Sequence, residues 1–326
     1  MKIAAALTTA SLVAVTGCSS PAPEASTDTG NAGVVARIVT VGSPGTSYGF
    51  VSDKVRETVA KTGATAEATG YFPATEPALE ALNAGAADIA EVATSGALSG
   101  LAGRGDYIFL GVNTKAPGTN TTIVVPNDSP VRTFEDLVGR SVAVTRGGAG
   151  EYIVDMALAN RGLSADKINK VFLGPGDAAA AFTNGSVDAW AAFSTFIPSA
   201  LERMNARTIV KREELDGKYD YGVLVVRREF AQQHPTVAKA VLDGYAAASD
   251  ETRADPTAWL EKQRSTNGFS PSQLKYLEEN LGRYEPYDAE TTADLQSSID
   301  AWVKIGTLQR PLVASEIIFD YDAAGD

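Results

Sequence analysis

The sequence predicts an α/β protein of two similar lobes, each a parallel-rich sheet flanked by helices, joined by a two-stranded hinge. β-branched runs alternate with glycine-containing loops and amphipathic stretches, which is typical of strand–loop–helix units. The same succession recurs about a hundred residues later. Two further apolar runs then lead from one half to the other and back. With roughly 150 residues per domain as a prior, 326 residues suffice for two lobes.

The first half begins with a β-branched strand over residues 34–41, followed by a loop at 42–49 and an amphipathic helix from Phe50. A second helix ends near Gly85, which has the position of a helix C-cap. Asp88 opens a short strand as a turn and register residue, and residues 107–110 form the next strand. These elements predict a β-α-β-α-β unit with right-handed crossovers.

The second half repeats these signals. A strand at 141–145, a glycine-rich loop at 146–150 and an apolar helical stretch follow one another, and residues 181–189 align with 81–89. Asp188 thereby takes the place of Asp88, and residues 207–210 align with 107–110. Chance similarity of the two halves is the alternative, and it predicts the same architecture.

Residues 121–125 and 221–226 are apolar runs that predict the two hinge strands. The division that follows is lobe one at 34–124 and 224–326, and lobe two at 125–223. The C-terminal helices are assigned to lobe one, because the chain has already returned to it. Their starts are predicted at Pro235, Pro256, Pro271 and Asp288.

Composition excludes several classes of function. The 40 acidic and 28 basic residues give a net charge of -12, so no nucleic acid partner is expected. The chain has one Cys and one His, too few for disulfides, Cys/His zinc sites or a Ser-His-Asp triad. His234 precedes a predicted helix start, which favours a surface or capping role. We expect no catalytic residue, metal or cofactor.

Residues 1–17 predict a secretion signal, with Lys2 ahead of a small apolar run of about 13 residues, too short to span a bilayer. The run ends in Val-Thr-Gly-Cys, which resembles the bacterial lipobox. Cys18 is then the lipidated N-terminus, residues 18–33 are a tether, and the protein is anchored at the outer face of the bacterial cell membrane. A plain secretory signal with an incidental Cys is the alternative.

Ligands of open parallel sheets bind beyond the carboxyl ends of the strands, where loops enter helices. Two lobes on a hinge place these loops opposite each other, which predicts a ligand cleft between them. The predicted ligand-binding residues of lobe one are Ser43, Thr46, Ser47, Tyr48, Tyr71, Thr75, Glu76, Thr94 and Ser95. Those of lobe two are Arg146, Gly147, Gly148, Tyr152, Phe193, Ser194, Phe196 and Tyr221.

Arg146 lies at the predicted mouth of a helix, where its guanidinium and the N–H groups of residues 147–150 are suited to hold a sulfonate or carboxylate together. The alternative is a solvated arginine beside a tight turn. Glu76 heads a helix and either contacts ligand or caps that helix. The aromatic residues either enclose the ligand or pack in the core, and Trp190 is assigned to the core.

Three stretches carry a resemblance to a known family: EPALEALNAGAADI at 76–89, DLVGRSVAVTRGG at 136–148 and DAAAAFTNGSVDAW at 177–190. They resemble the aliphatic-sulfonate, taurine and nitrate binding lipoproteins of bacterial ABC importers, over nearly the whole chain beyond the tether. The resemblance implies a type II periplasmic binding protein fold and a monomer that captures a small solute by hinge closure. It also implies delivery to permease subunits with a cytoplasmic ATPase.

Many relatives continue the third stretch into Trp-Asp-Pro-Tyr, whereas this chain reads Phe-Ser-Thr-Phe at 193–196. The missing carboxylate suits an anionic ligand, because no like charge is then buried beside it. We therefore expect a non-enzymatic receptor for a small organic anion, foremost an aliphatic sulfonate. Nitrate, carboxylates and heterocyclic cofactor precursors remain alternative ligands.

Two other classes of function are compatible with such a chain. An enzyme of the same superfamily, such as a pyrimidine-precursor synthase, would place reactive His, Lys or Cys groups in the cleft, and the predicted cleft segments contain no His or Cys. A sensory or scaffold domain would stand beside a transmembrane or signalling segment.

Overall fold

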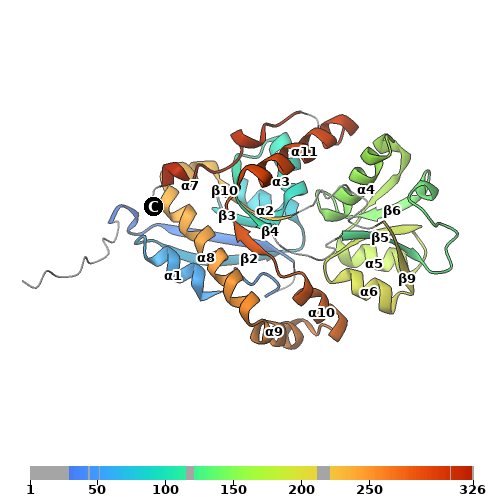
Figure 1. Cartoon of the computed structure of the whole chain (residues 1–326), viewed down its shortest axis with the longest axis horizontal. Coiled ribbons are helices and arrows are strands. Elements are labelled where there is room, and N and C mark those ends of the chain that lie inside the picture. The colour runs from blue at the N-terminus through green and yellow to red at the C-terminus, as the bar shows by residue number, and fades with distance from the viewer. Residues whose placement is uncertain are drawn as a thin grey trace, which may run out of the picture.

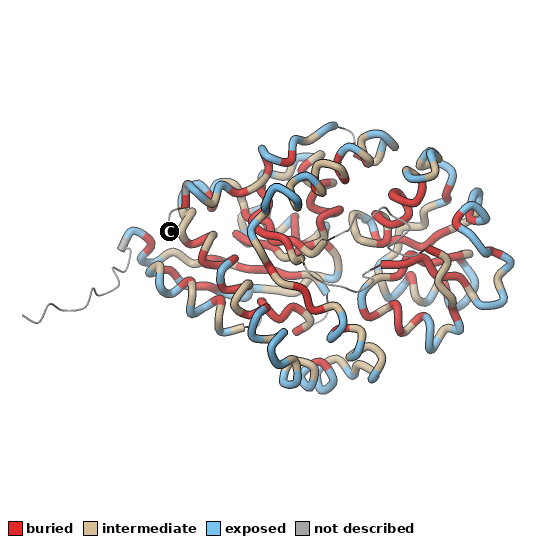
Figure 2. Tube along the Cα trace, viewed as in Figure 1, coloured by how far each residue is buried: buried red, intermediate tan, exposed pale blue. Residues whose placement is uncertain are grey.

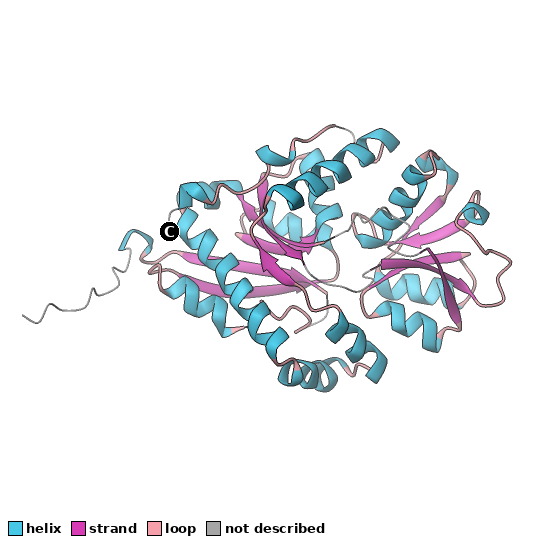
Figure 3. Cartoon of the chain, viewed as in Figure 1, coloured by secondary structure: helices cyan, strands magenta, loops and turns pink. Residues whose placement is uncertain are grey.

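The computed structural model describes residues 29–42, 45–50, 52–114, 121–210, 221–308 and 310–324. Two sheets, each flanked by helices, lie side by side along the long axis of the molecule (Figures 1 and 3). The predicted signal peptide and Cys18 lie outside the described residues. Among the described residues, none of the helices combines the length and apolar composition of a membrane span.

The first sheet has six strands in the order β11-β4-β10-β3-β1-β2. β1, β2 and β3 run parallel, and β10 is antiparallel to both of its neighbours. The bounds are β1 (Val35–Val41), β2 (Thr65–Phe72), β3 (Ile89–Ala93), β4 (Tyr107–Thr114), β10 (Gly222–Arg227) and β11 (Arg283–Glu285).

The second sheet has five strands in the order β7-β6-β8-β5-β9. β6, β7 and β8 run parallel, and β5 is antiparallel to β8 and β9. The bounds are β5 (Thr121–Pro126), β6 (Ser141–Val144), β7 (Asn169–Phe172), β8 (Ala189–Phe193) and β9 (Ala206–Val210). This order matches β2-β1-β3-β10-β4 of the first sheet strand by strand, as the predicted repeat requires.

Each sheet contains one strand that follows a crossing from the other half. β4 belongs to the first sheet and β5 to the second, and β9 belongs to the second sheet and β10 to the first. Residues 115–120 and 211–220, between these strands, lie outside the described residues. All of β5 pairs in the second sheet and all of β10 in the first. The predicted lobe boundaries after Val124 and Val223 therefore fall inside β5 and β10. The sequence did not indicate this, because an apolar run has the same pattern whichever sheet it joins.

Helices cover both faces of each sheet. In the first lobe, α1 and α8 pack on the face that carries Ile38, and α2 and α3 on the face that carries Val39. The buried residues follow the strands in both lobes (Figure 2).

The helices are α1 (Asp53–Ala60), α2 (Thr75–Asn83), α3 (Thr94–Gly103), α4 (Ala149–Asn160), α5 (Pro175–Thr183), α6 (Phe196–Arg203), α7 (Arg228–Gln233), α8 (Pro235–Ala254), α9 (Thr257–Asn267), α10 (Pro271–Glu279) and α11 (Ala289–Ile305). Short 3-10 turns occupy Thr29–Asn31, Glu135–Leu137, Ala165–Lys167, Ala314–Glu316 and Asp322–Ala324.

The helix starts agree with the sequence prediction. His234 occupies the N-cap position before Pro235, and Pro271 is the first residue of α10. Asp288 caps α11 by accepting a hydrogen bond from Thr291 N at 2.8 Å. α9 starts one residue later than predicted, at Thr257.

Two of the C-terminal helices bridge the lobes, whereas all of them were assigned to lobe one. α10 packs against α6, and the Nε2 of Gln273 donates to the carbonyl of Thr195 at 3.2 Å. α11 packs against α4, where the ring of Trp302 lies 5.6 Å from that of Tyr152. The apolar pattern of these helices predicts that one face is buried, but it does not identify the lobe that buries it.

Asp88 and Asp188 fix the register of their sheets, as predicted. Asp88 accepts hydrogen bonds from the backbone N and the Nε of Arg37 and from Arg227, at 2.9 to 3.1 Å. Asp188 takes the equivalent position, with the backbone N and Oγ of Ser141 at 2.9 and 2.7 Å. Burial opposes the charge on Asp88, but the hydrogen bonds from the two arginines outweigh it and lower its pKa.

Candidate functional site

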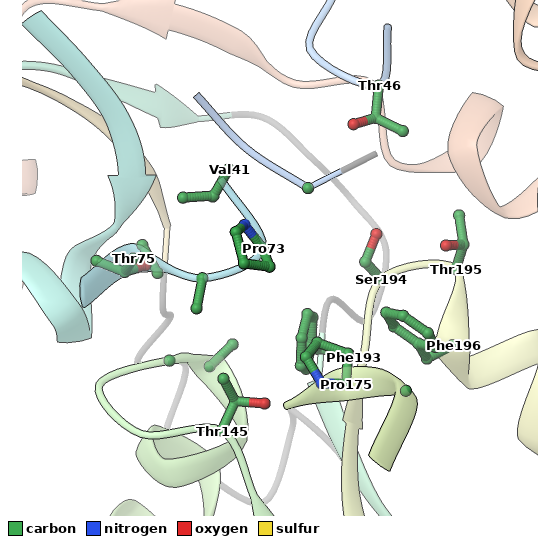
Figure 4. A pocket seen from close by; sticks show the side chains of 16 residues that line it. Val41, Thr46, Pro73, Thr75, Thr145, Pro175, Phe193, Ser194, Thr195 and Phe196 are labelled. Carbon is green, nitrogen blue, oxygen red and sulfur yellow. The ribbon is translucent and has the colours of Figure 1, made fainter. Parts of the chain in front are cut away.

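A cavity of about 470 Å³ lies between the carboxyl ends of the two sheets (Figure 4). Six loops line it, from equivalent positions in the two lobes: those after β1, β2 and β3, and those after β6, β7 and β8. The first lobe contributes Val41, Gly42, Thr46, Pro73, Ala74, Thr75 and Ala93. The second contributes Thr145, Gly148, Ala149, Pro175, Gly176, Phe193, Ser194, Thr195 and Phe196.

Four helices begin at this cavity. The first residues of α2, α4, α5 and α6 line it, and none of these four helices has a side-chain hydrogen bond at its N-cap. The N–H groups of a helix's first turn lack intrahelical partners, and the helix dipole places partial positive charge there. The cavity therefore combines several positive helix ends, which favours an anion.

The lining side chains supply hydroxyl groups and apolar surface. Thr75, Thr145 and Ser194 are among the hydroxyl residues, and Phe193 and Phe196 form an aromatic wall with ring centroids 5.6 Å apart. Among the described residues that line the cavity, none carries a charged side chain. The carboxylates nearest these helix ends, Glu76, Glu151 and Asp177 in the first turns of α2, α4 and α5, are not part of the lining.

Ser194 marks a local departure from ordinary backbone geometry. Its φ is 50°, in the left-handed region that residues other than glycine seldom adopt. The residue lies between Phe193 and Thr195 in the turn that joins β8 to α6, and all three line the cavity. The turn therefore directs three successive residues at one site, at the cost of backbone strain.

Six of the predicted site residues line the cavity: Thr46, Thr75, Gly148, Phe193, Ser194 and Phe196. The sequence prediction selected aromatic, hydroxyl and charged residues and the two glycines after Arg146, and it missed other small residues such as Ala74, Ala149 and Gly176. Their position directly after a predicted strand was the available signal. Ser43 lies outside the described residues.

Arg146 lies between the lobes, as predicted, but it does not line the main cavity. It lines a separate cavity of about 380 Å³ together with Gly147 and Glu76, and its guanidinium carbon lies 3.8 Å from the centroid of the Phe172 ring. The N–H of Gly147 donates to Glu151 at 2.8 Å, so it is already satisfied. Gly147 has a φ of 59°, and this left-handed turn separates Arg146 from Gly148.

The remaining predicted residues support the loops or the core. Ser47 Oγ accepts from the N–H of Phe50, and the hydroxyl of Tyr71 accepts from the N–H of Gly45, both at 3.0 Å. The hydroxyl of Thr94 donates to the carbonyl of Tyr221 at 3.0 Å, which links the start of α3 to the residue before β10. Ser95 and Tyr152 are buried, and Tyr48 lines a smaller adjoining cavity. Trp190 is fully buried in the core, as expected.

Solved structures share this architecture. The alkanesulfonate-binding protein of Xanthomonas axonopodis pv. citri, bound to MOPS, superposes with a TM-score of 0.77, covers 88% of this chain and 98% of its own, and is 23% identical. The periplasmic aliphatic sulphonate binding protein of Escherichia coli gives a TM-score of 0.74 at 24% identity, with 88% and 92% covered. The predicted two-lobed α/β fold is thereby confirmed.

Curated relatives agree with the resemblance found in the sequence. A putative aliphatic sulfonates-binding protein of E. coli (strain K12) is 29% identical over 70% of this chain and 72% of its own. A taurine-binding periplasmic protein of the same strain is 29% identical over 39% of this chain and 40% of its own. Both are named as binding proteins. Residues 65–258 match the family described as NMT1/THI5 like, which is more than half of the sequence. The chain belongs to the NMT1/THI5-like family.

Proposed function

We propose that this chain is the extracytoplasmic solute-binding protein of an ABC importer and that it captures an aliphatic sulfonate. The observation that carries the proposal is the cavity between the lobes, where α2, α4, α5 and α6 begin without side-chain caps and no charged side chain is part of the described lining. The sulfonate-binding relatives support this choice of anion.

The two parts of an aliphatic sulfonate match the two kinds of surface in the cavity. The sulfonate oxygens are hydrogen-bond acceptors, so the N–H groups of the helix ends and the hydroxyls of Thr75 and Ser194 can donate to them. The alkyl part would pack against Pro73, Phe193 and Phe196. A cavity of about 470 Å³ favours a ligand with such an apolar part over nitrate.

Hinge closure is the proposed mode of capture. Groups from both lobes line the cavity, so a small ligand contacts all of them only when the lobes are drawn together, and its differential affinity then favours the closed state. Gly96 lets the backbones of the two lobes approach each other closely, because a Cβ at this position would lie 2.3 Å from the carbonyl oxygen of Gly147 in the other lobe.

A ligand panel tests the proposal by thermal shift and calorimetry. We expect n-alkanesulfonates to raise the melting temperature, since a ligand at 100 times its Kd stabilises by about 2.7 kcal/mol. The matched n-alkanols control for the alkyl part, and n-alkanoates, nitrate and pyrimidines represent the alternative ligands. Stabilisation by one of these alternatives with no response to any sulfonate would refute the sulfonate assignment.

We further propose that residues 1–17 are removed as a signal peptide and that lipidated Cys18 attaches a monomeric protein to the outer face of the bacterial cell membrane. There it would serve permease subunits with a cytoplasmic ATPase. The support is the sequence Val-Thr-Gly-Cys before the Pro- and Ser-containing tether.

Replacing Cys18 with serine is expected to release the protein from membranes, because the residue that would be acylated is then absent. Detergent phase partitioning of wild type and Cys18→Ser measures this, and Ser19→Ala is the matched control. If the wild-type protein itself partitions into the aqueous phase, the lipid anchor is excluded.

A further inference from the structure

Helices α9 and α10 form a hairpin, residues 257–279, that reaches loops on both walls of the main cavity. α9 contacts the loop after β1 in the first lobe, and α10 packs against α6 of the second lobe (Figure 1). In each case a side chain of the hairpin donates a hydrogen bond to a backbone carbonyl of the loop. The hairpin is therefore placed to hold binding-site loops to which it does not belong.

α9 is fixed to the first lobe. The indole Nε1 of Trp259 donates to the carbonyl of Gly45 at 3.0 Å, and the buried Gln263 donates from its Nε2 to the same carbonyl. The ring of Trp259 also makes an edge contact with that of Tyr48, with the centroids 6.0 Å apart. Because Gly45 directly precedes Thr46, which lines the main cavity, this end of the hairpin supports the first wall.

α10 contacts the second lobe through three side chains. The Nε2 of Gln273 donates to the carbonyl of the buried Thr195 at 3.2 Å. The Oγ of Ser272 donates to Glu202 of α6, and Tyr276 packs against the hydrophobic cluster of this lobe. Of these contacts, the one from Gln273 reaches a residue that lines the main cavity.

The amide of Gln273 has a defined orientation. Its Oε1 accepts from the N–H of Ser270 at 3.0 Å, and the Oγ of Ser270 accepts from the N–H of Gln273 at 3.4 Å, which together form the capping box of α10. The oxygen of the amide is thus used on α10 itself, and the nitrogen faces Thr195. One side chain therefore both caps α10 and reaches across to the second lobe.

The turn that Gln273 contacts has a strained backbone. Ser194 has a φ of 50°, and such a conformation persists only where the surrounding contacts determine it. One of these contacts comes from within the second lobe, where the N–H of Ile197 donates to the carbonyl of Ser194 at 3.1 Å. Gln273 adds a contact from the first lobe, which exists only while the two lobes are together. The geometry of the turn is therefore coupled to closure.

We infer that Gln273 is a positioning residue of the binding site, which holds the turn at residues 193–196 in its ligand-binding geometry when the lobes close. The inference rests on the proposed function, since it takes the main cavity to be the ligand site. Gln273 is not among the described lining residues and acts through Thr195. Its loss should therefore shorten the lifetime of the closed complex more than it slows association.

A Gln273→Glu variant separates this role from stability. The new carboxylate keeps an oxygen for the N–H of Ser270, so the capping box and the fold should be retained. When ionised it has no donor for Thr195, and its charge faces a carbonyl oxygen. At about pH 8 we expect the n-alkanesulfonates of the panel to bind roughly 10-fold or more weakly than to the wild type, mainly through faster dissociation. Calorimetry and stopped-flow kinetics measure the binding, and thermal denaturation checks the fold.

Acidification should restore binding to this variant. A protonated carboxyl group donates through its hydroxyl, so at about pH 4, near the ordinary pKa of a glutamate, the variant should approach the wild-type affinity. Glu202 titrates in both proteins, so the comparison is the ratio of the two Kd values at each pH. A Gln273→Met variant has neither donor nor charge and should stay weak at both pH values. A purely structural role of Gln273 would not produce this recovery.

The matched control is Gln232→Glu, since Gln232 is exposed in α7, and it should bind as the wild type does at both pH values. Wild-type affinity of Gln273→Glu at the higher pH would overturn the inference and leave the proposed function intact. A loss of affinity that acidification does not reverse would overturn it as well.

The ligand panel keeps the two proposals apart. If an alkanoate, nitrate or a pyrimidine binds the wild-type chain and no sulfonate does, the sulfonate assignment fails, and the compound that binds becomes the probe for Gln273→Glu. If no compound of the panel binds the wild-type chain, the proposed function fails and this inference fails with it.

Discussion

Replacing Ala149 with aspartate is expected to weaken ligand binding several-hundred-fold and to leave the fold intact. Ala149 is the first residue of α4 and lines the main cavity. An acidic residue in the first turn complements the helix dipole, so the substitution does not oppose folding. Its carboxylate would repel a bound sulfonate by roughly 4 kcal/mol, for two charges about 4 Å apart at an effective dielectric constant near 20. Calorimetry measures the affinity, and thermal denaturation checks the fold.

Two control variants make this test specific. Ala149→Asn has the same shape without the charge and should lose far less affinity. Arg146→Ala should bind as the wild type does, because Arg146 lines the separate cavity and stacks on Phe172. The opposite pattern, in which Ala149→Asp binds normally and Arg146→Ala does not, would place the anion at Arg146.

Removing the amine of Lys170 is expected to cost about 3–5 kcal/mol of folding free energy, the usual cost of breaking a buried ion pair from one side. The Nζ of Lys170 lies 2.9 Å from Asp155, whose side chain is fully buried, and 3.1 Å from Glu151. Burial opposes the charge of the amine, but the two carboxylates outweigh it and raise the pKa of Lys170. Lys170→Met would leave both carboxylates without this cation, and urea denaturation measures the loss.

The control for Lys170→Met is Lys167→Met, at an exposed position three residues earlier, which should change stability by less than about 0.5 kcal/mol. Adding Asp155→Asn to Lys170→Met should recover part of the loss, because the buried charge is removed as well. A loss below about 1 kcal/mol in Lys170→Met would mean that other groups stabilise Asp155 and Glu151, and that their ion pairs with Lys170 do not determine the stability of the fold.

Local signals in the sequence predicted the loops of the site better than its individual contacts. Glycines and hydroxyl residues directly after β-branched runs indicated where strands end, and the repeat placed equivalent loops in both halves. This is why Thr75, Gly148 and Ser194 were identified: their role follows from their position at a strand end.

The direction of a side chain depends on groups that are distant in sequence. Arg146 was expected beside the anion, but the turn at Gly147 and the ring of Phe172, from the next strand, hold it in a second cavity between the lobes. Likewise, Asn113 and Asn280 of the smaller adjoining cavity come from β4 and from the residue after α10, and only the packing of elements distant in sequence brings them together. No pattern within one element contains that information.

The return of β10 to the first sheet makes completion of the first lobe depend on synthesis of the second. β10 occupies a central place in the first sheet, between β3 and β4, yet more than a hundred residues separate it from them along the chain. A growing chain that ends before Gly222 therefore exposes two unpaired strand edges inside its first sheet, and such edges template aggregation. The first lobe cannot be completed before the entire second sheet has been synthesised, so truncated products should be poor candidates for independent folding units, and the intact chain should fold slowly through non-local pairings.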